Sequence, residues 1–308
     1  MGCEIVRYQD ELKVLCFLTT LYHGMMHFHN DIEIIYMIEG SVFVKAKGEM
    51  VLMKKNDIFI LEKNIPHDFE GTDEKNAALV MQFNPSFSAG FYPRLSRLRF
   101  TRNLLTPADG RIYDEMRRSV LSVVKSFRSK TEGFSFAITR TVCDICIQIV
   151  EDMQTVELTA ELVNREERNI TRLTRIMEYV NAGYMNRITL KELSALEGLN
   201  MCYLSHFIKD NLGMSFQQYL NKVRIKNAER MIAGTDKSNL DICIACGFSD
   251  YRYLHKAFVA EYGCTPAQYK KRSGSAEAQS MREWMEGYPN GVVYIDKVSE
   301  KALGFLET

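Results

Sequence analysis

The sequence lacks any long apolar run and any crowded set of cysteines. No apolar stretch approaches the roughly 18 residues that a membrane-spanning helix requires, so no membrane contact is expected. The first residues, MGCEIVRYQDELK, carry acids and lack the basic and apolar segments of a secretion signal. The 8 cysteines are spread over 308 residues, which favours reduced thiols over a disulfide framework. Together these absences predict a cytoplasmic protein.

The chain also lacks net charge, because 39 Lys and Arg balance 39 Asp and Glu. Hydrophobic residues make up 46% and charged residues 25%, which excludes a wholly disordered or collagen-like chain. The balance conceals unequal segments: residues 169–272 hold 15 basic and 9 acidic residues, whereas residues 273–308 hold 3 and 6. A compact basic segment indicates nucleic-acid binding, although a solvated helix face can also be basic.

The length suggests about two domains, and the pattern changes along the chain in agreement with this. Between Leu12 and Phe83, short apolar or alternating runs separated by turn residues predict an antiparallel sheet or small barrel. Residues 111–129 and 134–153 space apolar side chains at three and four, as amphipathic helices do. Residues 169–272 are helical in pattern throughout. The predicted fold class is α+β with two domains.

The predicted segments follow from these changes of pattern. They are 1–105 for an effector-binding barrel, 106–154 for helices that dimerise or pack, 155–168 for a linker that can be partly helical, 169–272 for an all-α DNA-binding domain, and 273–308 for an extension of unknown role. In the extension, a strand-like run follows the only Trp, and a short helix and strand docked on the DNA-binding domain is one prediction. A loosely ordered tail is the other.

Residues 190–213 and 240–263 repeat one pattern, a helix, a glycine break and a second helix. Gly198 and Gly247 supply the sharp turn, Asn200 and Ser249 are the expected N-caps, and Gly213 and Gly263 close the units. This is the pattern of a helix-turn-helix. Residues 215–234 lie between the two copies and predict one amphipathic helix that acts as a rigid spacer.

Two recognition helices on one stiff spacer can reach successive major grooves, which lie about 34 Å apart on one face of a duplex. Polar side chains on the recognition helices can hydrogen-bond to base edges, and lysine and arginine side chains can contact phosphates. The residues expected to contact DNA are Cys202, Ser205, His206 and Lys209 from the first unit and Tyr251, Arg252, His255 and Lys256 from the second; Lys209, Lys222, Arg224 and Lys226 are expected on phosphates.

The helical segment resembles the AraC/XylS family of transcription regulators between Ile188 and Arg272. The resemblance rests on Leu204, Gly213, Arg224, Ala228, Ile242, the run Gly247-Phe248-Ser249-Asp250, Tyr253, Phe258, Gly263, Thr265-Pro266 and Tyr269-Lys270. It implies a sequence-specific transcription regulator with double-stranded DNA as partner. It also implies a homodimer formed through residues 111–129 and 134–153, with intramolecular packing as the alternative, and RNA polymerase as a further candidate partner.

The segment HFHNDIEIIYMIEG (27–40), with a downstream histidine in KNDIFILEKNIPHDF, resembles the two cupin motifs. In a strand, residues i and i+2 share a face, so His27 and His29 can converge and Glu33 can join them. Tyr36 is a candidate stacking face. The residues expected to bind an effector are His27, His29, Glu33, Tyr36 and His67.

Three functions of this histidine group stay open. The resemblance to sensor domains of the family implies a small-molecule effector, a carbohydrate, with no enzyme activity, no catalytic residue and no cofactor. The alternative is a metal-dependent cupin enzyme or metal sensor that uses His27, His29, Glu33 and His67, because three His and one Glu suit a transition metal. The third possibility is that these side chains only line a partly polar barrel.

Overall fold

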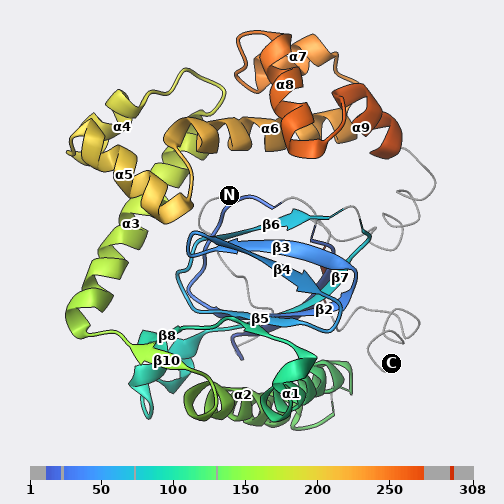
Figure 1. Ribbon diagram of the computed structural model, residues 1–308, viewed down its shortest axis with the longest axis vertical. Coiled ribbons are helices and arrows are strands. Elements are labelled where there is room, and N and C mark those ends of the chain that lie inside the picture. Colours follow the sequence, from blue (N-terminus) through green and yellow to red (C-terminus); the bar gives the residue numbers. More distant parts are fainter. Residues whose placement is uncertain (1–11, 22–23, 73, 130, 274–291, 295–308) are drawn as a thin grey trace. The chain divides into compact units, whose positions relative to one another are not determined.

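The structure is a computed structural model that describes residues 12–21, 24–72, 74–129, 131–273 and 292–294 (Figure 1). Internal contacts divide the chain into two compact units, one built mainly from residues 28–168 and the other from residues 169–273. Strands β1 and β11 belong to the first unit. Each unit is described on its own below.

The first unit consists of two antiparallel sheets followed by helices, as the sequence predicts. The larger sheet has the strand order β11-β1-β7-β2-β5-β9, and the smaller has the order β4-β3-β6. The strands are β1 Val14–Thr19, β2 Ile32–Glu39, β3 Ser41–Ala46, β4 Glu49–Lys54, β5 Ile58–Leu61, β6 His67–Gly71, β7 Ala77–Phe83, β9 Leu104–Leu105 and β11 Val292–Tyr294. Two further strands, β8 Leu98–Phe100 and β10 Thr155–Glu157, pair with each other.

Strand β2 is buried on both faces, which explains its almost continuous apolar sequence. Ile35 and Met37 belong to the core between the two sheets, together with Val42 and Val44 of β3. Residues of the opposite parity, such as Ile34, belong to a second core against helices α1 (Arg111–Ser129) and α2 (Phe134–Glu151). The helices cover the outer face of the larger sheet (Figure 1). Both helices were predicted from spacing and are confirmed.

The connecting segments contain two features that the pattern did not predict. Residues 155–168, expected to be a linker with some helix, form the first part of helix α3 (Ala160–Gly183) as well as strand β10, which was not expected. Strand β11 of the C-terminal extension pairs with β1 in the larger sheet, with Phe17 opposite Tyr294, and not with the helical unit. The helix expected in the extension lies outside the described residues.

The second unit is helical and contains the predicted repeat. Its elements are the end of α3, then α4 Leu190–Glu197, α5 Met201–Leu212, α6 Phe216–Gly234, α7 Asn239–Ala245, α8 Tyr251–Tyr262 and α9 Pro266–Ser273. Helices α4 and α5 form the first helix-turn-helix and α7 and α8 the second, with α6 between them (Figure 1).

The ends of these helices match the sequence with one exception. Gly198, Gly213 and Gly263 have left-handed backbones at helix C-termini, and Asn200 caps α5 by accepting a hydrogen bond from the Tyr203 amide. Helix α8 is capped by Asp250, whose carboxylate accepts from the Arg252 amide at 2.7 Å, and not by Ser249 as expected. A carboxylate is well placed there because a helix N-terminus attracts negative charge.

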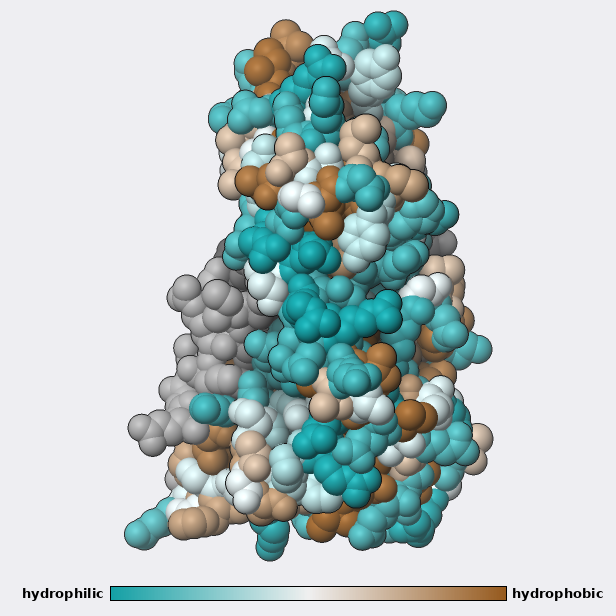
Figure 2. Space-filling model, turned by 90° about the vertical axis from the view of Figure 1, so that its left-hand side faces the viewer, coloured by the Kyte–Doolittle hydropathy of each residue, from teal (hydrophilic) through white to brown (hydrophobic). Residues whose placement is uncertain are grey.

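No described helix is both long and apolar enough to cross a bilayer. The face of the molecule shown in Figure 2 is predominantly hydrophilic, with hydrophobic side chains scattered over it. The seven described cysteines are free thiols, and those in the helix-turn-helix core, Cys243 and Cys246, are buried.

Gly247 joins the turn of the second helix-turn-helix to the loop between α3 and α4. Its φ is +75°, and a Cβ added there would lie 2.6 Å from the Tyr184 carbonyl oxygen and 2.7 Å from that of Met185. Gly213 has a similar φ of +67° with nothing within 4 Å of an added Cβ. An alanine at Gly247 would therefore suffer both a steric clash and backbone strain, whereas an alanine at Gly213 would suffer the strain alone.

We predict that Gly247→Ala destabilises the protein by ~3 kcal/mol or more, because strain and a backbone clash combine. Gly213→Ala should cost about 1 kcal/mol, the strain alone. Thermal melting of the full chain followed by far-UV circular dichroism compares the two. Equal melting temperatures for both variants would contradict the close approach at Gly247.

Candidate effector site and DNA-binding surface

The first candidate site is a group of buried polar side chains inside the first unit. Glu33 projects from β2, and His67 begins β6. His29 Nε2 lies 3.0 Å from Glu33 Oε2, and His67 Nε2 lies 3.6 Å from Glu33 Oε1. The side chains of both histidines are 1% exposed, and that of Glu33 is 4% exposed. The structure brings the three predicted residues together in the buried interior of this unit.

His27 completes the histidine group. Ligand atoms of His27, His29 and His67 all lie within 4.8 Å of one another. The Nδ1 atoms of His27 and His67 lie 2.8 Å from the carbonyl oxygens of Met25 and Ile65. Because a carbonyl oxygen only accepts hydrogen bonds, Nδ1 is the donor in both rings, and Nε2 is the atom left to face the group. This orientation is that of a metal-binding histidine with its other nitrogen fixed.

Gln82 of β7 belongs to the same group, although no sequence pattern predicts it. Its amide donates to Glu33 Oε2 at 2.6 Å, and the residue is 2% exposed. In the sheet register Gln82 lies directly opposite Glu33. Only the pairing of β2 with β7 reveals this neighbour, and the two residues are 49 positions apart in the sequence.

Tyr36 does not join the site, which corrects the expectation. It lies three residues beyond Glu33 on the same strand and therefore points to the opposite face. Its hydroxyl accepts a hydrogen bond from Arg117 Nε at 2.9 Å and donates to Asn56 Oδ1 at 3.0 Å. Burial raises the pKa of the nearby Tyr113 to about 12. Tyr36 thus attaches β2 to helix α1.

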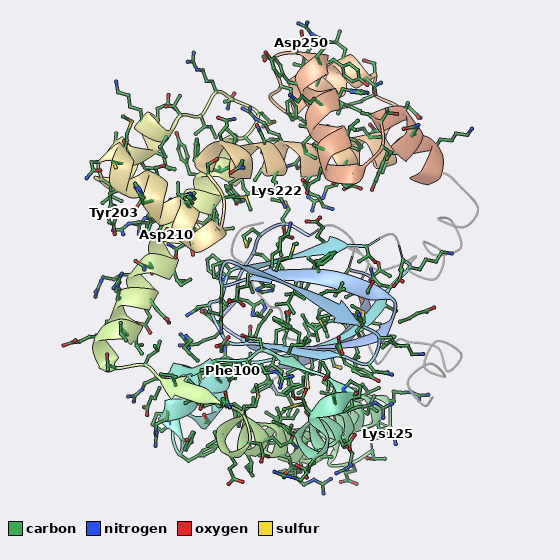
Figure 3. All side chains as sticks on the ribbon, viewed as in Figure 1. Phe100, Lys125, Tyr203, Asp210, Lys222 and Asp250 are labelled. Atoms are coloured by element: carbon green, nitrogen blue, oxygen red, sulfur yellow. The ribbon has the colours of Figure 1, made fainter. Side chains whose placement is uncertain are left out.

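The second candidate site is the pair of recognition helices. Four residues predicted on α5 are exposed: Cys202, Ser205, His206 and Lys209. His206 Nδ1 lies 2.8 Å from the Cys202 carbonyl oxygen, so the imidazole is held along the helix. Figure 3 labels Tyr203 and Asp210 on α5 and Asp250 before α8, near opposite ends of the α6 spacer.

Helix α8 divides its predicted residues between two flanks. Arg252 has a side chain that is 88% exposed, and its guanidinium donates to both carboxylate oxygens of Asp250 at 3.1 and 3.0 Å. These hydrogen bonds lower the pKa of Asp250. Lys256 is exposed and lines a groove together with Tyr253, which is 63% exposed and was not selected from the sequence.

Tyr251 and His255 lie on the other flank of α8. Both are half-buried, and their rings contact each other with centroids 5.9 Å apart. The Tyr251 hydroxyl accepts from the Asn239 amide of α7 at 3.4 Å. These two side chains are therefore engaged with each other and with α7, unlike Arg252 and Lys256.

Arg224, expected on phosphate, is engaged within the protein. Its Nε donates to the Tyr184 carbonyl oxygen at 2.8 Å and its Nη2 to the Asn186 carbonyl oxygen at 2.9 Å. The guanidinium also lies over the Phe248 ring, and burial lowers its pKa. Lys222 is ion-paired with Glu261 at 3.5 Å. Arg224 fastens the α3–α4 loop to the spacer helix.

Known proteins resemble both units. Residues 18–118 match the family model described as an AraC-like ligand binding domain, and residues 193–272 match a helix-turn-helix domain. The transcriptional activator RhaS of Klebsiella pneumoniae is 22% identical over 259 residues, which cover 80% of this chain and 87% of RhaS. An uncharacterized regulator of Staphylococcus aureus, SAR0107, is 21% identical over 91% of this chain but only 38% of its own length.

Two solved structures are also similar to this chain. The C-terminal domain of the response regulator yesN from Fusobacterium nucleatum is 33% identical, and the match covers 32% of this chain and 95% of that domain with a TM-score of 0.31. ToxT from Vibrio cholerae with bound unsaturated fatty acid is 16% identical over 86% of this chain and 97% of ToxT, with a TM-score of 0.44. With a ligand-binding family model on its first half and a helix-turn-helix model on its second, the chain belongs to the AraC family of DNA-binding transcription regulators.

Proposed function

We propose that this protein recognises a specific DNA sequence and regulates transcription in response to a small effector bound by its first unit. The observation that carries the proposal is the pair of helix-turn-helix units on the single helix α6, each with exposed polar side chains on its second helix. The excess of basic residues in residues 169–272 supports attraction to DNA phosphates. Binding and not catalysis is the proposed role, in the cytoplasm where the DNA lies.

The residues proposed to read bases are the exposed ones. Ser205 and His206 of α5 suit single hydrogen bonds, and Arg252 of α8 suits a bidentate contact with guanine. Lys209 and Lys256 suit phosphates or base edges at the margins. Asp250 holds the Arg252 guanidinium in one orientation before DNA arrives, which reduces the rotamer entropy lost on binding.

We predict that Arg252→Ala weakens binding to a duplex selected by the full chain from a random pool by about 1–3 kcal/mol, and relaxes the base preference at one position. Lys271→Ala, an exposed cation in α9, is the matched control and should leave the base preference intact. Fluorescence anisotropy and a repeated selection provide the measurements. An unchanged preference in the Arg252 variant would show that Arg252 reads no base.

A carbohydrate is one effector class that we propose for the first unit. The site offers donors and acceptors of several kinds: the imidazoles of His29 and His67, the Glu33 carboxylate and the Gln82 amide. Sugar hydroxyls both donate and accept, so such a set suits them. The Phe69 ring packs edge-on against the His67 ring, with the ring centroids 5.7 Å apart, and provides an apolar face nearby. Since these polar groups are almost fully buried, a sugar requires the two sheets to separate locally.

A divalent transition metal is a second candidate, and the arrangement of acceptors favours it. Ligand atoms of His27, His29 and His67 lie within 4.8 Å of one another, and Glu33 Oε1 lies 3.6 Å from His67 Nε2. Such a group is stabilised by a positive charge, either an added proton on an imidazole or a metal ion. A single ion can bridge the three histidines, because their ligand atoms lie this close together. The metal would then be the sensed effector, held by His27, His29, Glu33 and His67.

We predict that the true effector raises the melting temperature of the full chain and that His29→Ala abolishes this rise. The panel contains simple sugars, small acids, and Zn²⁺, Mn²⁺, Ni²⁺ or Fe²⁺ added to chelator-treated protein. Tyr36→Phe changes the opposite face of the adjacent strand β2 and serves as control, because it should preserve the rise. If neither sugars nor metals shift melting, the polar group only lines the interior.

The homodimer expected through α1 and α2 stays a prediction. On α2, Phe136 is 83% exposed and Ile147 is 52% exposed, so apolar side chains are available for a contact between copies. RNA polymerase likewise stays a candidate partner.

A further inference from the structure

The second unit carries two grooves that share one lining. A groove of about 500 Å³ is lined by Ser205 of α5, and another of about 750 Å³ is lined by Tyr253 and Lys256 of α8. Three side chains line both grooves: Arg187 of the α3–α4 loop, and Gln217 and Arg224 of α6. The surface between the two recognition helices is therefore formed by this loop and by the spacer helix.

The loop that carries Arg187 is fixed at several points. Arg224 donates to the carbonyl oxygens of Tyr184 and Asn186, on either side of Met185. The backbone amide of Asn186 donates to the Gly183 carbonyl oxygen at 2.8 Å. Gly247 approaches the Tyr184 and Met185 carbonyls so closely that no side chain fits. The backbone next to Arg187 is thus held by the spacer helix and by the turn of the second helix-turn-helix.

Within the described part of the chain, Arg187 itself forms no ion pair, and its side chain is exposed. This contrasts with the other basic side chains at the centre of the unit. Arg224 is occupied by carbonyl oxygens, and Lys222 and Lys226 pair with Glu261 and Glu229. Arg187 is the cation that this central surface presents to a ligand.

We propose that Arg187 enters the DNA minor groove between the two major grooves that α5 and α8 occupy. On one face of a duplex, a minor groove lies between two successive major grooves. A residue that lines the grooves beside both recognition helices faces that intermediate position. Arginine is favoured in narrow, A·T-rich minor grooves, where the negative potential is strongest. The loop therefore selects the sequence between the half-sites, where neither recognition helix reaches.

This inference rests on the proposed DNA-binding function and adds a third contact to it. It also explains why the backbone of the loop is held so firmly. A guanidinium fixed at its Cα loses less entropy on entering a groove than one on a free loop. The same fixation sets the position of Arg187 relative to both helix-turn-helix units.

The test uses the full chain and a duplex that it selects from a random pool. The base pairs between the half-sites are changed to A·T, G·C or inosine·C. Inosine·C removes the guanine amino group from the minor groove and keeps the major-groove pattern of G·C. The wild-type chain should bind A·T and inosine·C duplexes roughly tenfold more tightly than G·C. Arg187→Ala should remove this difference, and Arg187→Lys should reduce it.

Lys191→Ala, an exposed cation on α4 that lines neither groove, is the matched control and should keep the preference. If Arg187→Ala lowers affinity equally for all three duplexes, or keeps the preference, the minor-groove contact is wrong while the proposed function stands. If the wild-type chain selects no duplex at all, the proposed function fails first. Melting curves of the Arg187 variants confirm that each has folded.

Discussion

The DNA-binding unit depends on the burial of helix α6, because this one helix contributes to the core beneath each helix-turn-helix. Phe216, Tyr219 and Leu220 are buried at its beginning, and Ile225 and Ala228 are buried further along. Ala228 belongs to the apolar cluster that includes Ile242, Leu254 and Phe258 of α7 and α8. A helix of 19 residues spans about 28 Å at ~1.5 Å per residue. The two helix-turn-helix motifs of the second unit are therefore held a fixed distance apart by one rigid helix.

The loop between α3 and α4 adds a second restraint on the same geometry. The Arg224 guanidinium donates hydrogen bonds to two carbonyl oxygens of this loop. Gly247 has no side chain, so the loop carbonyls can lie against it. Gly247 links the second helix-turn-helix to the loop that precedes the first, and Arg224 fixes the same loop to α6. A module restrained in this way presents its DNA-facing side chains as one preorganised surface. Arg224 is engaged by the loop carbonyls, and Arg187 of the same loop is the exposed cation beside it.

In the first unit, strand β2 carries the two features that a sensor has to connect. Glu33 faces the buried polar group, and Tyr36 on the opposite face hydrogen-bonds Arg117 of α1. An effector that changes the position of Glu33 therefore acts on the strand to which α1 is attached. Such a connection regulates DNA binding only if the effector binds the DNA-competent and incompetent states with different affinity.

Much of this structure follows from local pattern, and the exceptions have physical causes. Helical spacing and capping glycines predicted α1, α2 and the repeated units. Tyr36 lies an odd number of residues after Glu33 on one strand, so the two side chains point to opposite faces, and this alone excludes Tyr36 from the site. Gln82 and β11 depend on strand pairing across long sequence separations, which no local pattern records. Strand β6 has no recognisable strand pattern, because its sequence HDFEG contains only one large apolar side chain.

The most direct test of the fixed spacing is a change in the distance between the two half-sites of a selected duplex. Footprinting first locates the base pairs protected by α5 and by α8, and five base pairs, about half a helical turn, are then inserted between them. The account predicts that the full chain loses nearly all specific affinity, because the second half-site moves to the opposite face of the duplex. Unchanged affinity after this insertion would contradict a rigid spacer and a preorganised surface.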